Sequence, residues 1–135
     1  MKKINTVLLI DDDEPTNFIH KKIIQNCGLV SAIQVANSGL QALNMLDHHA
    51  GSTNDSSLPD LIFLDINMPA MDGWEFLAQY KKLTTAQNKN IIIVMLTTSL
   101  NPDDEVRAKQ IKEVYAYKSK PLTGQMINEI ANTYF

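Results

Sequence analysis

Acidic residues directly follow two apolar segments of this sequence. Three consecutive aspartates, residues 11–13, follow the apolar segment 7–10, and Asp65 follows the apolar segment 61–64. Clustered carboxylates raise one another's pKa values unless a cation lies among them. Because the candidate ligand atoms are all oxygen, a hard divalent cation such as Mg²⁺ is expected to bind these residues.

A hydroxyl and an ammonium group occupy comparable positions farther along the chain. Thr97 follows the apolar run 91–96, and Lys120 lies shortly after the segment 114–117. A carboxylate beside a divalent cation can attack phosphorus and form an aspartyl phosphate. The cation, the ammonium group and the hydroxyl would neutralise the charge that develops during such a transfer. These residue types therefore indicate phosphoryl transfer to a carboxylate.

Five short segments are predicted to be the strands that position these groups. Three of them lack polar alternation, which is typical of central parallel strands covered on both faces. Two contain polar interruptions and therefore fit edge strands. The central segments are residues 7–10, 61–64 and 91–96, and the edge segments are residues 32–36 and 114–117.

Helical patterns alternate with the predicted strands, which indicates an α/β fold. With right-handed crossovers, the pattern predicts a flavodoxin-like doubly wound parallel sheet of five strands in the order 2-1-3-4-5, with five helices. Ligands bind such sheets at the carboxyl ends of the strands, near the first and third strands. The expected apolar helix positions are Phe18, Ile19, Ile23 and Ile24; Leu40, Leu43 and Leu46; Trp74, Phe76, Leu77, Tyr80 and Leu83; Val106 and Ile111; and Met126, Ile127, Ile130 and Tyr134.

Other polar residues are expected to have structural roles. The segment 48–58 is rich in small polar residues and is expected to form a surface loop. The three histidines have no metal-ligand spacing and are expected to be exposed to solvent; they are His20, His48 and His49. The expected helix caps are Asp13, Ser38, Asn101 and Thr123, with Gly28 ending the first helix.

The sequence resembles the receiver domain of two-component response regulators, in the stand-alone form typical of chemotaxis proteins. The resemblance covers residues 4–135, and its most specific part is the segment 65–73, which is similar to the phosphorylation-site motif of that family. The acidic pair 11–12, Thr97 and the dipeptide 120–121 match in the same order. The resemblance implies one receiver domain over residues 1–135, without an output domain.

The resemblance assigns roles to the acidic residues. Asp65 would accept the phosphoryl group. Asp12, Asp65 and the backbone carbonyl of Asn67 would bind Mg²⁺, with Mn²⁺ as a possible substitute, and Asp11 would hold the cation through water.

The resemblance also assigns the residues that respond to phosphorylation. Lys120, which precedes a proline in a bond that is usually cis in the family, would contact the phosphoryl oxygens; Lys118 is a competing candidate by residue type. Thr97 would donate a hydrogen bond to the phosphoryl group, and Tyr117 would be the aromatic switch residue, although it also fits an ordinary edge-strand position. Thr98 is bulkier than the small residue common at this position and is expected to crowd the site.

The implied partners follow from the same family. A histidine kinase or a histidine phosphotransfer protein would donate the phosphoryl group. The face formed by the fourth helix, the fifth strand and the fifth helix would bind an unknown downstream protein or a second copy of the chain. We expect no enzyme activity beyond self-catalysed phosphotransfer and slow autodephosphorylation.

Composition agrees with a signalling domain that acts away from nucleic acid and membranes. The net charge is -3 without a basic run, which gives no basis for nucleic-acid binding. The longest apolar run, residues 91–96, is far shorter than a membrane span. The single cysteine, Cys27, favours a reducing compartment, and we expect a cytoplasmic location.

Two other functions remain open from the sequence alone. A phosphatase of the haloacid dehalogenase type also uses an Asp-x-Asp motif at a strand end, which residues 11–13 fit superficially. That interpretation leaves the motif at Asp65 unexplained. The second alternative is a binding scaffold that has the receiver fold but is not phosphorylated.

Overall fold

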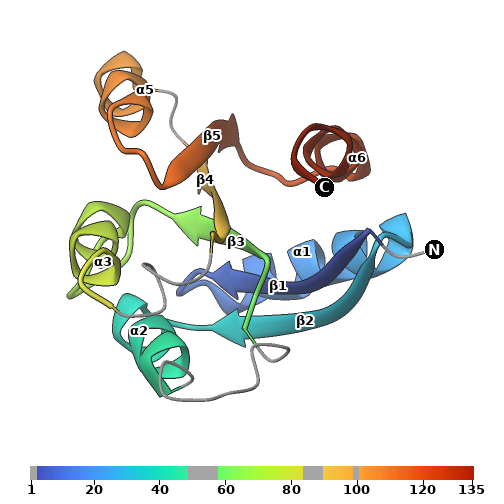
Figure 1. The fold of residues 1–135 in the computed structure, drawn as a ribbon, viewed down its shortest axis with the longest axis horizontal. Helices are drawn as coiled ribbons and strands as arrows, with labels where there is room; N and C mark the ends of the chain where they lie inside the picture. The colour runs from blue at the N-terminus through green and yellow to red at the C-terminus, as the bar shows by residue number, and fades with distance from the viewer. Residues whose placement is uncertain (1–2, 49–57, 84–89, 99–100) are drawn as a thin grey trace.

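The computed structural model describes residues 3–48, 58–83, 90–98 and 101–135, in which strands and helices alternate (Figure 1). The predicted loop at residues 48–58 lies mostly outside these ranges, and the side chains of His48 and His49 lie outside what the structure describes. The strands are β1 (Ile4–Ile10), β2 (Val30–Ala36), β3 (Leu61–Asp65), β4 (Ile92–Thr97) and β5 (Val114–Ser119). The helices are α1 (Glu14–Cys27), α2 (Gly39–His48), α3 (Gly73–Tyr80), α5 (Pro102–Lys109) and α6 (Gly124–Tyr134).

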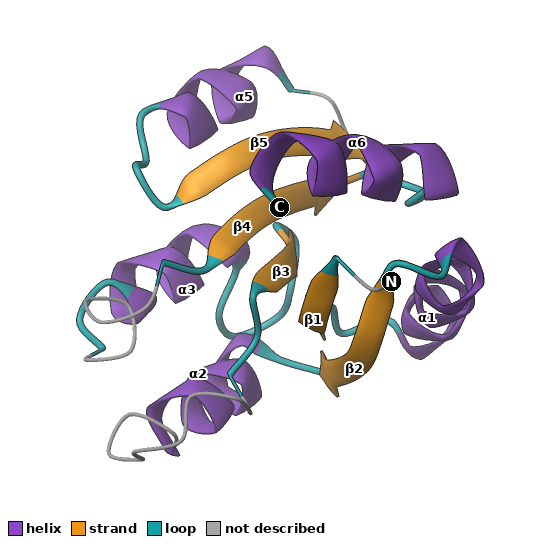
Figure 2. Ribbon diagram, turned by 45° about the vertical axis from the view of Figure 1, so that its right-hand side comes forward, coloured by secondary structure: helices purple, strands orange, loops and turns teal. Residues whose placement is uncertain are grey.

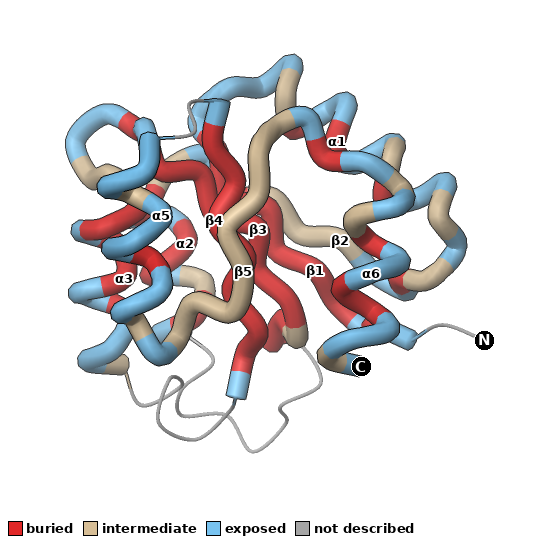
Figure 3. The backbone as a smooth tube through the Cα atoms, turned by 90° about the horizontal axis from the view of Figure 1, so that it is seen from above, coloured by how far each residue is buried: buried red, intermediate tan, exposed pale blue. Residues whose placement is uncertain are grey.

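The strands form one parallel sheet, and its order confirms the predicted topology. The order is β2-β1-β3-β4-β5, and all four neighbouring pairs are parallel. The central strands β1, β3 and β4 are almost entirely buried, whereas the edge strands β2 and β5 are only partly covered (Figure 3). The fold is therefore a flavodoxin-like α/β domain, and the uninterrupted apolar segments are its central strands.

Helices cover both faces of the sheet (Figure 2). Successive side chains of a strand point to opposite faces, so each central strand contributes to two cores. In β1, Val7 and Leu9 pack in the core beneath α1 and α6, whereas Leu8 and Ile10 pack in the core beneath α2, α3 and α5. None of the helices in the described ranges is long and apolar enough to cross a membrane.

The buried face of α1 matches the predicted one only in part. Phe18 and Ile19 are 64% and 52% exposed, although their spacing fits an apolar helix face. Ile24 is buried as predicted and Ile23 packs partly buried against the core, but the other buried residues of α1 are Asn17 and His20. This face turns toward the sheet and α6, and it places two polar side chains near the carboxyl end of β1.

The apolar face of α5 is thin, and only one of its two predicted anchors, Ile111, packs against the core. Val106 is 57% exposed, and Ala108 is the buried residue of this helix. Ile111, just beyond the helix, packs partly buried against the core. The Arg107 guanidinium lies over the ring of Trp74 at 4.4 Å. Little apolar area therefore holds α5 to the domain, and Leu40 in α2 is likewise exposed instead of buried.

The helix ends confirm the predicted caps. In each N-terminal cap, a side-chain oxygen accepts a hydrogen bond from a backbone N–H of the first turn. That N–H has no acceptor within the helix, so the cap satisfies it. Gly28 follows α1 with φ of +73°, a conformation that glycine adopts without steric strain. The capping residues are Asp13, Ser38, Asn101 and Thr123.

Candidate functional site

The ends of three strands bring the predicted carboxylates and the threonine to one edge of the sheet. Asp11 follows β1, Asp65 ends β3 and Thr97 ends β4. These three side chains are buried, whereas Asp12 is exposed. One carboxylate oxygen of each of Asp11, Asp12 and Asp65 lies within 4.8 Å of the other two. The acidic cluster expected from the sequence is therefore present.

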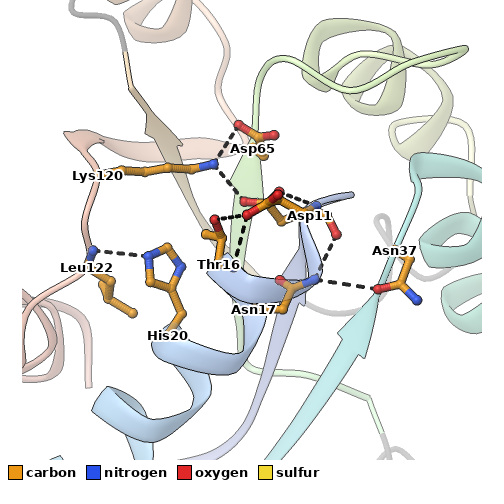
Figure 4. A network of polar contacts seen from close by, with 9 residues as sticks. Asp11, Thr16, Asn17, His20, Asn37, Asp65, Lys120 and Leu122 are labelled. Carbon is orange, nitrogen blue, oxygen red and sulfur yellow. Dashed lines mark hydrogen bonds and ion pairs between the residues drawn. The ribbon is translucent and has the colours of Figure 1, made fainter.

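Lys120 lies just beyond β5, and its ammonium group is between two of these carboxylates (Figure 4). The Nζ atom is 2.6 Å from Asp11 Oδ2 and 3.1 Å from Asp65 Oδ1. The Lys120 side chain is only 11% exposed, and its peptide bond to Pro121 is cis. Within the described residues, both buried carboxylates form their ion pairs with Lys120. This pairing favours Lys120 over Lys118 as the lysine of the site.

The charges in this pocket do not balance. Burial and the neighbouring charge of Asp11 raise the pKa of Asp65, and the attraction of Lys120 together with a hydrogen bond from the Asn67 backbone offsets only part of this effect. Burial lowers the pKa of Lys120, but hydrogen bonds and attraction to Asp11 and Asp65 outweigh burial and leave that pKa raised. The pocket holds more negative charge than one ammonium group neutralises, so it favours a further cation.

Asn17 holds the backbone beside the cluster. Its side-chain Nδ2 donates a hydrogen bond of 2.8 Å to the backbone carbonyl of Asp11, and the backbone N–H of Asp13 donates one of 3.0 Å to Asp11 Oδ1. Asn17 is a site residue that the local sequence patterns do not reveal. Its spacing from Ile24 on the same helix is the signal that could have found it, because positions seven apart share a helix face.

His20 is buried, which contradicts the expectation that the histidines are exposed. Its side chain is on the covered face of α1 and is only 3% exposed. Its Nε2 accepts a hydrogen bond of 3.3 Å from the backbone N–H of Leu122 (Figure 4). Burial lowers the pKa of His20, and the nearby charge of Lys120 lowers it further, so the ring is neutral at neutral pH.

Thr97 and Tyr117 are in contact. A side-chain hydrogen bond joins them, although Tyr117 is on the edge strand β5 and is only partly buried. Burial and the charge of Asp104 raise the pKa of Tyr117, and the hydrogen bond with Thr97 opposes that shift. The two predicted switch residues are therefore neighbours, while Thr98 is exposed beside them and its effect on phosphoryl transfer stays a prediction.

The donor atoms of the cluster fit a divalent metal ion. Three carboxylates contribute hard oxygen ligands, and the exposed position of Asp12 leaves the cluster open to solvent. Mg²⁺ binds in proteins through one or two carboxylates and keeps several waters, which such an open cluster allows. Asn67, whose carbonyl the resemblance adds to the ligands, follows the buried Asp65 by two residues and is itself exposed.

Residues 7–132 match the response regulator receiver domain family. The chain belongs to this family. Receiver domains are signalling modules and not a family of catalytic enzymes, so the phosphatase alternative is rejected. The acidic pocket of Asp11, Asp12 and Asp65 is consistent with phosphoacceptor signalling in two-component systems.

Similar receiver proteins include regulators from archaea and bacteria. The chain is 32% identical over 117 residues to the probable methanogenesis regulatory protein FilR2 of Methanothrix harundinacea, covering 87% of this chain and 72% of that protein. It is 31% identical over 117 residues to response regulator Rcp1 of Synechocystis, covering 86% and 78%. It is 29% identical over 124 residues to the sensor histidine kinase CheAY of Helicobacter pylori, of which it spans 14%. Receiver domains partner with histidine kinases.

Solved receiver structures share the whole fold. A two component response regulator from Cytophaga hutchinsonii is 37% identical, with a TM-score of 0.88 over 97% of this chain and 96% of that one. The Mn²⁺-bound form of Rcp1 is 28% identical, with a TM-score of 0.73 over 96% and 93%. The acidic cluster of this receiver is able to hold a metal, and the Rcp1 structure binds one.

Removing the site lysine tests the charge balance of the pocket. In buffer without divalent cations at pH 7, Lys120→Met is expected to lower the free energy of unfolding by about 3 kcal/mol, because two buried carboxylates lose their paired cation. Urea unfolding measures this change. Lys118→Met, two residues earlier on β5, is the matched control and is expected to change stability by about 1 kcal/mol or less. Equal stability of Lys120→Met and the wild-type protein would contradict the pairing.

Proposed function

We propose that this receiver is the phosphoacceptor of a two-component phosphorelay, and that Asp65 takes a phosphoryl group from a phosphohistidine. The donor is a histidine kinase or a histidine phosphotransfer protein. The observation that carries the proposal is the pairing of one Lys120 ammonium group with both Asp11 and Asp65 in an open acidic cluster. A pocket of this charge can bind a divalent cation and stabilise a transferred phosphoryl group.

Each residue of the pocket has a different role in the transfer of the phosphoryl group. A carboxylate oxygen of Asp65 attacks phosphorus, the nitrogen–phosphorus bond of the donor breaks, and its electron pair returns to the imidazole. Lys120, already 3.1 Å from Asp65, binds an oxygen of the arriving group, and the Thr97 hydroxyl donates a hydrogen bond to another. Mg²⁺ or Mn²⁺ held by Asp12, Asp65 and the carbonyl of Asn67, with Asp11 behind them, would supply further charge neutralisation.

Phosphorylation at Asp65 would change the face formed by α5, β5 and α6. Thr97 moves toward the phosphoryl group and gives up its hydrogen bond with Tyr117, whose ring is then free to change position. The helix α5 has Ala108 as its buried residue, so few contacts resist its displacement. This face then binds a downstream protein or a second copy of the receiver.

The phosphoacceptor assignment predicts the loss of one covalent phosphate. With acetyl phosphate and Mg²⁺, the wild-type protein gains one hydroxylamine-labile phosphate in intact mass, whereas Asp65→Asn gains none, because an amide is a poor nucleophile. Asp13→Asn is the control and retains the phosphate. A phosphate that peptide mapping places on another residue contradicts the assignment. A wild-type protein that gains none from acetyl phosphate or from a phosphohistidine donor is a scaffold.

The metal assignment predicts unequal effects of two neighbouring aspartates. Asp12→Ala is expected to weaken Mg²⁺ binding by about tenfold or more, because it removes a ligand. Asp13→Ala is the matched control, since Asp13 caps α1 through Thr16 and is expected to change affinity little. Calorimetric titration of both variants measures the affinities. Equal losses of Mg²⁺ affinity in the two variants would contradict the assignment of Asp12 as the ligand.

The switch assignment predicts that Thr97 couples the site to α5. A stable phosphoryl mimic such as beryllofluoride is expected to change amide exchange in α5 and β5 of the wild-type protein by about tenfold or more, as a charge-assisted hydrogen bond can. Thr97→Ala is expected to bind the mimic without that change, whereas Thr98→Ala, the exposed neighbour, retains it. Unchanged exchange in the wild-type α5 and β5 would refute this route.

A further inference from the structure

His20 is a buried polar residue for which the proposed phosphoryl transfer gives no role. It lies on the covered face of α1 with Asn17 and Ile24, and its ring is directed toward the chain that follows β5 (Figure 4). A histidine that is only 3% exposed carries a desolvation cost, so its ring nitrogens need hydrogen-bond partners.

The partner of His20 lies two residues after the site lysine. The Nε2 atom accepts a hydrogen bond of 3.3 Å from the backbone N–H of Leu122, and the Leu122 side chain is 1% exposed. An imidazole accepts a hydrogen bond only through an unprotonated nitrogen. The bond therefore requires the neutral ring with its proton on Nδ1.

The segment that carries Lys120 is held at both ends of one short turn. The backbone N–H of Lys120 donates a hydrogen bond of 2.7 Å to the carbonyl of Thr97, which ties the segment to β4. Pro121 has no N–H. The next donor, Leu122, bonds to His20 and ties the segment to α1. Both backbone donors that flank the proline are thus anchored to elements that carry residues of the pocket.

We propose that His20 is a positioning residue for the phosphoryl-transfer lysine: its imidazole fixes the turn after β5 against α1, so that the Lys120 ammonium group lies between Asp11 and Asp65. This inference rests on the proposed function and adds to it a residue that never contacts the phosphoryl group. Lys120 and Asp11 are the charged groups that act on the ring, and burial with the charge of Lys120 holds the His20 pKa below its ordinary value. The acceptor nitrogen is therefore available at neutral pH.

Two substitutions separate the hydrogen bond from the space that the ring fills. His20→Leu fills the site without an acceptor and is expected to slow phosphorylation of Asp65 by acetyl phosphate about two- to tenfold, the range of one hydrogen bond. His20→Gln offers an amide oxygen to the Leu122 N–H and is expected to restore the rate to within about twofold. Ile24→Val, one turn along the same buried face, controls for a general loss of packing and is expected to leave the rate unchanged.

A second measurement does not depend on phosphorylation. Nitrogen-15 NMR of the wild-type protein is expected to show an unprotonated Nε2 on His20 and slow exchange of the Leu122 amide, with faster exchange in His20→Leu than in His20→Gln. Equal phosphorylation rates for the Leu and Gln variants, or a protonated Nε2 at neutral pH, would overturn the role of His20. A wild-type protein with these NMR features that takes no phosphate on Asp65 would refute the proposed function. The hydrogen bond from the Leu122 N–H to His20 would still be established.

Discussion

This site depends on the electrostatic interaction between one ammonium group and three clustered carboxylates. Lys120 pairs with Asp11 and Asp65, yet the pKa of Asp65 remains raised, because burial and like charge outweigh the pairing. A parallel sheet makes such an arrangement possible, since the carboxyl ends of its strands meet at one edge. The same geometry leaves Asp12 exposed, so the unbalanced charge is open to a cation from solvent.

The sheet and the acidic cluster could be predicted because their signals are local in the sequence. Uninterrupted apolar segments identify the central strands, and the residue that follows each segment must lie at the edge where ligands bind. Asp11, Asp65 and Thr97 follow from this rule, and the structure places them at that edge. For the fifth segment the rule does not separate Lys118 from Lys120, and the preference for Lys120 comes from the resemblance to receiver domains. The helix caps were predictable for the same reason, because a cap depends on a residue and its first helical turn.

Local patterns could not predict which face of each helix is buried, nor which residues distant in sequence form hydrogen bonds. The sequence offers two helical faces for α1, and packing against the sheet and α6 selects the face of Asn17 and His20 instead of that of Phe18 and Ile19. The polar residues are accepted there because Asp11 and a turn 102 residues away supply their partners. A histidine of this kind looks like a surface residue until its distant partner is known.

Site-resolved carbon-13 NMR titration of the Asp65 carboxyl group tests the charge imbalance most directly. In buffer without divalent cations, the account predicts a pKa above the ordinary aspartate value of about 3.9, because burial disfavours the charged form and Asp11 adds a like charge that Lys120 offsets only in part. Adding Mg²⁺ is predicted to lower that pKa, since a bound cation favours the carboxylate. A pKa at or below the ordinary value without metal, unchanged by Mg²⁺, would contradict the account.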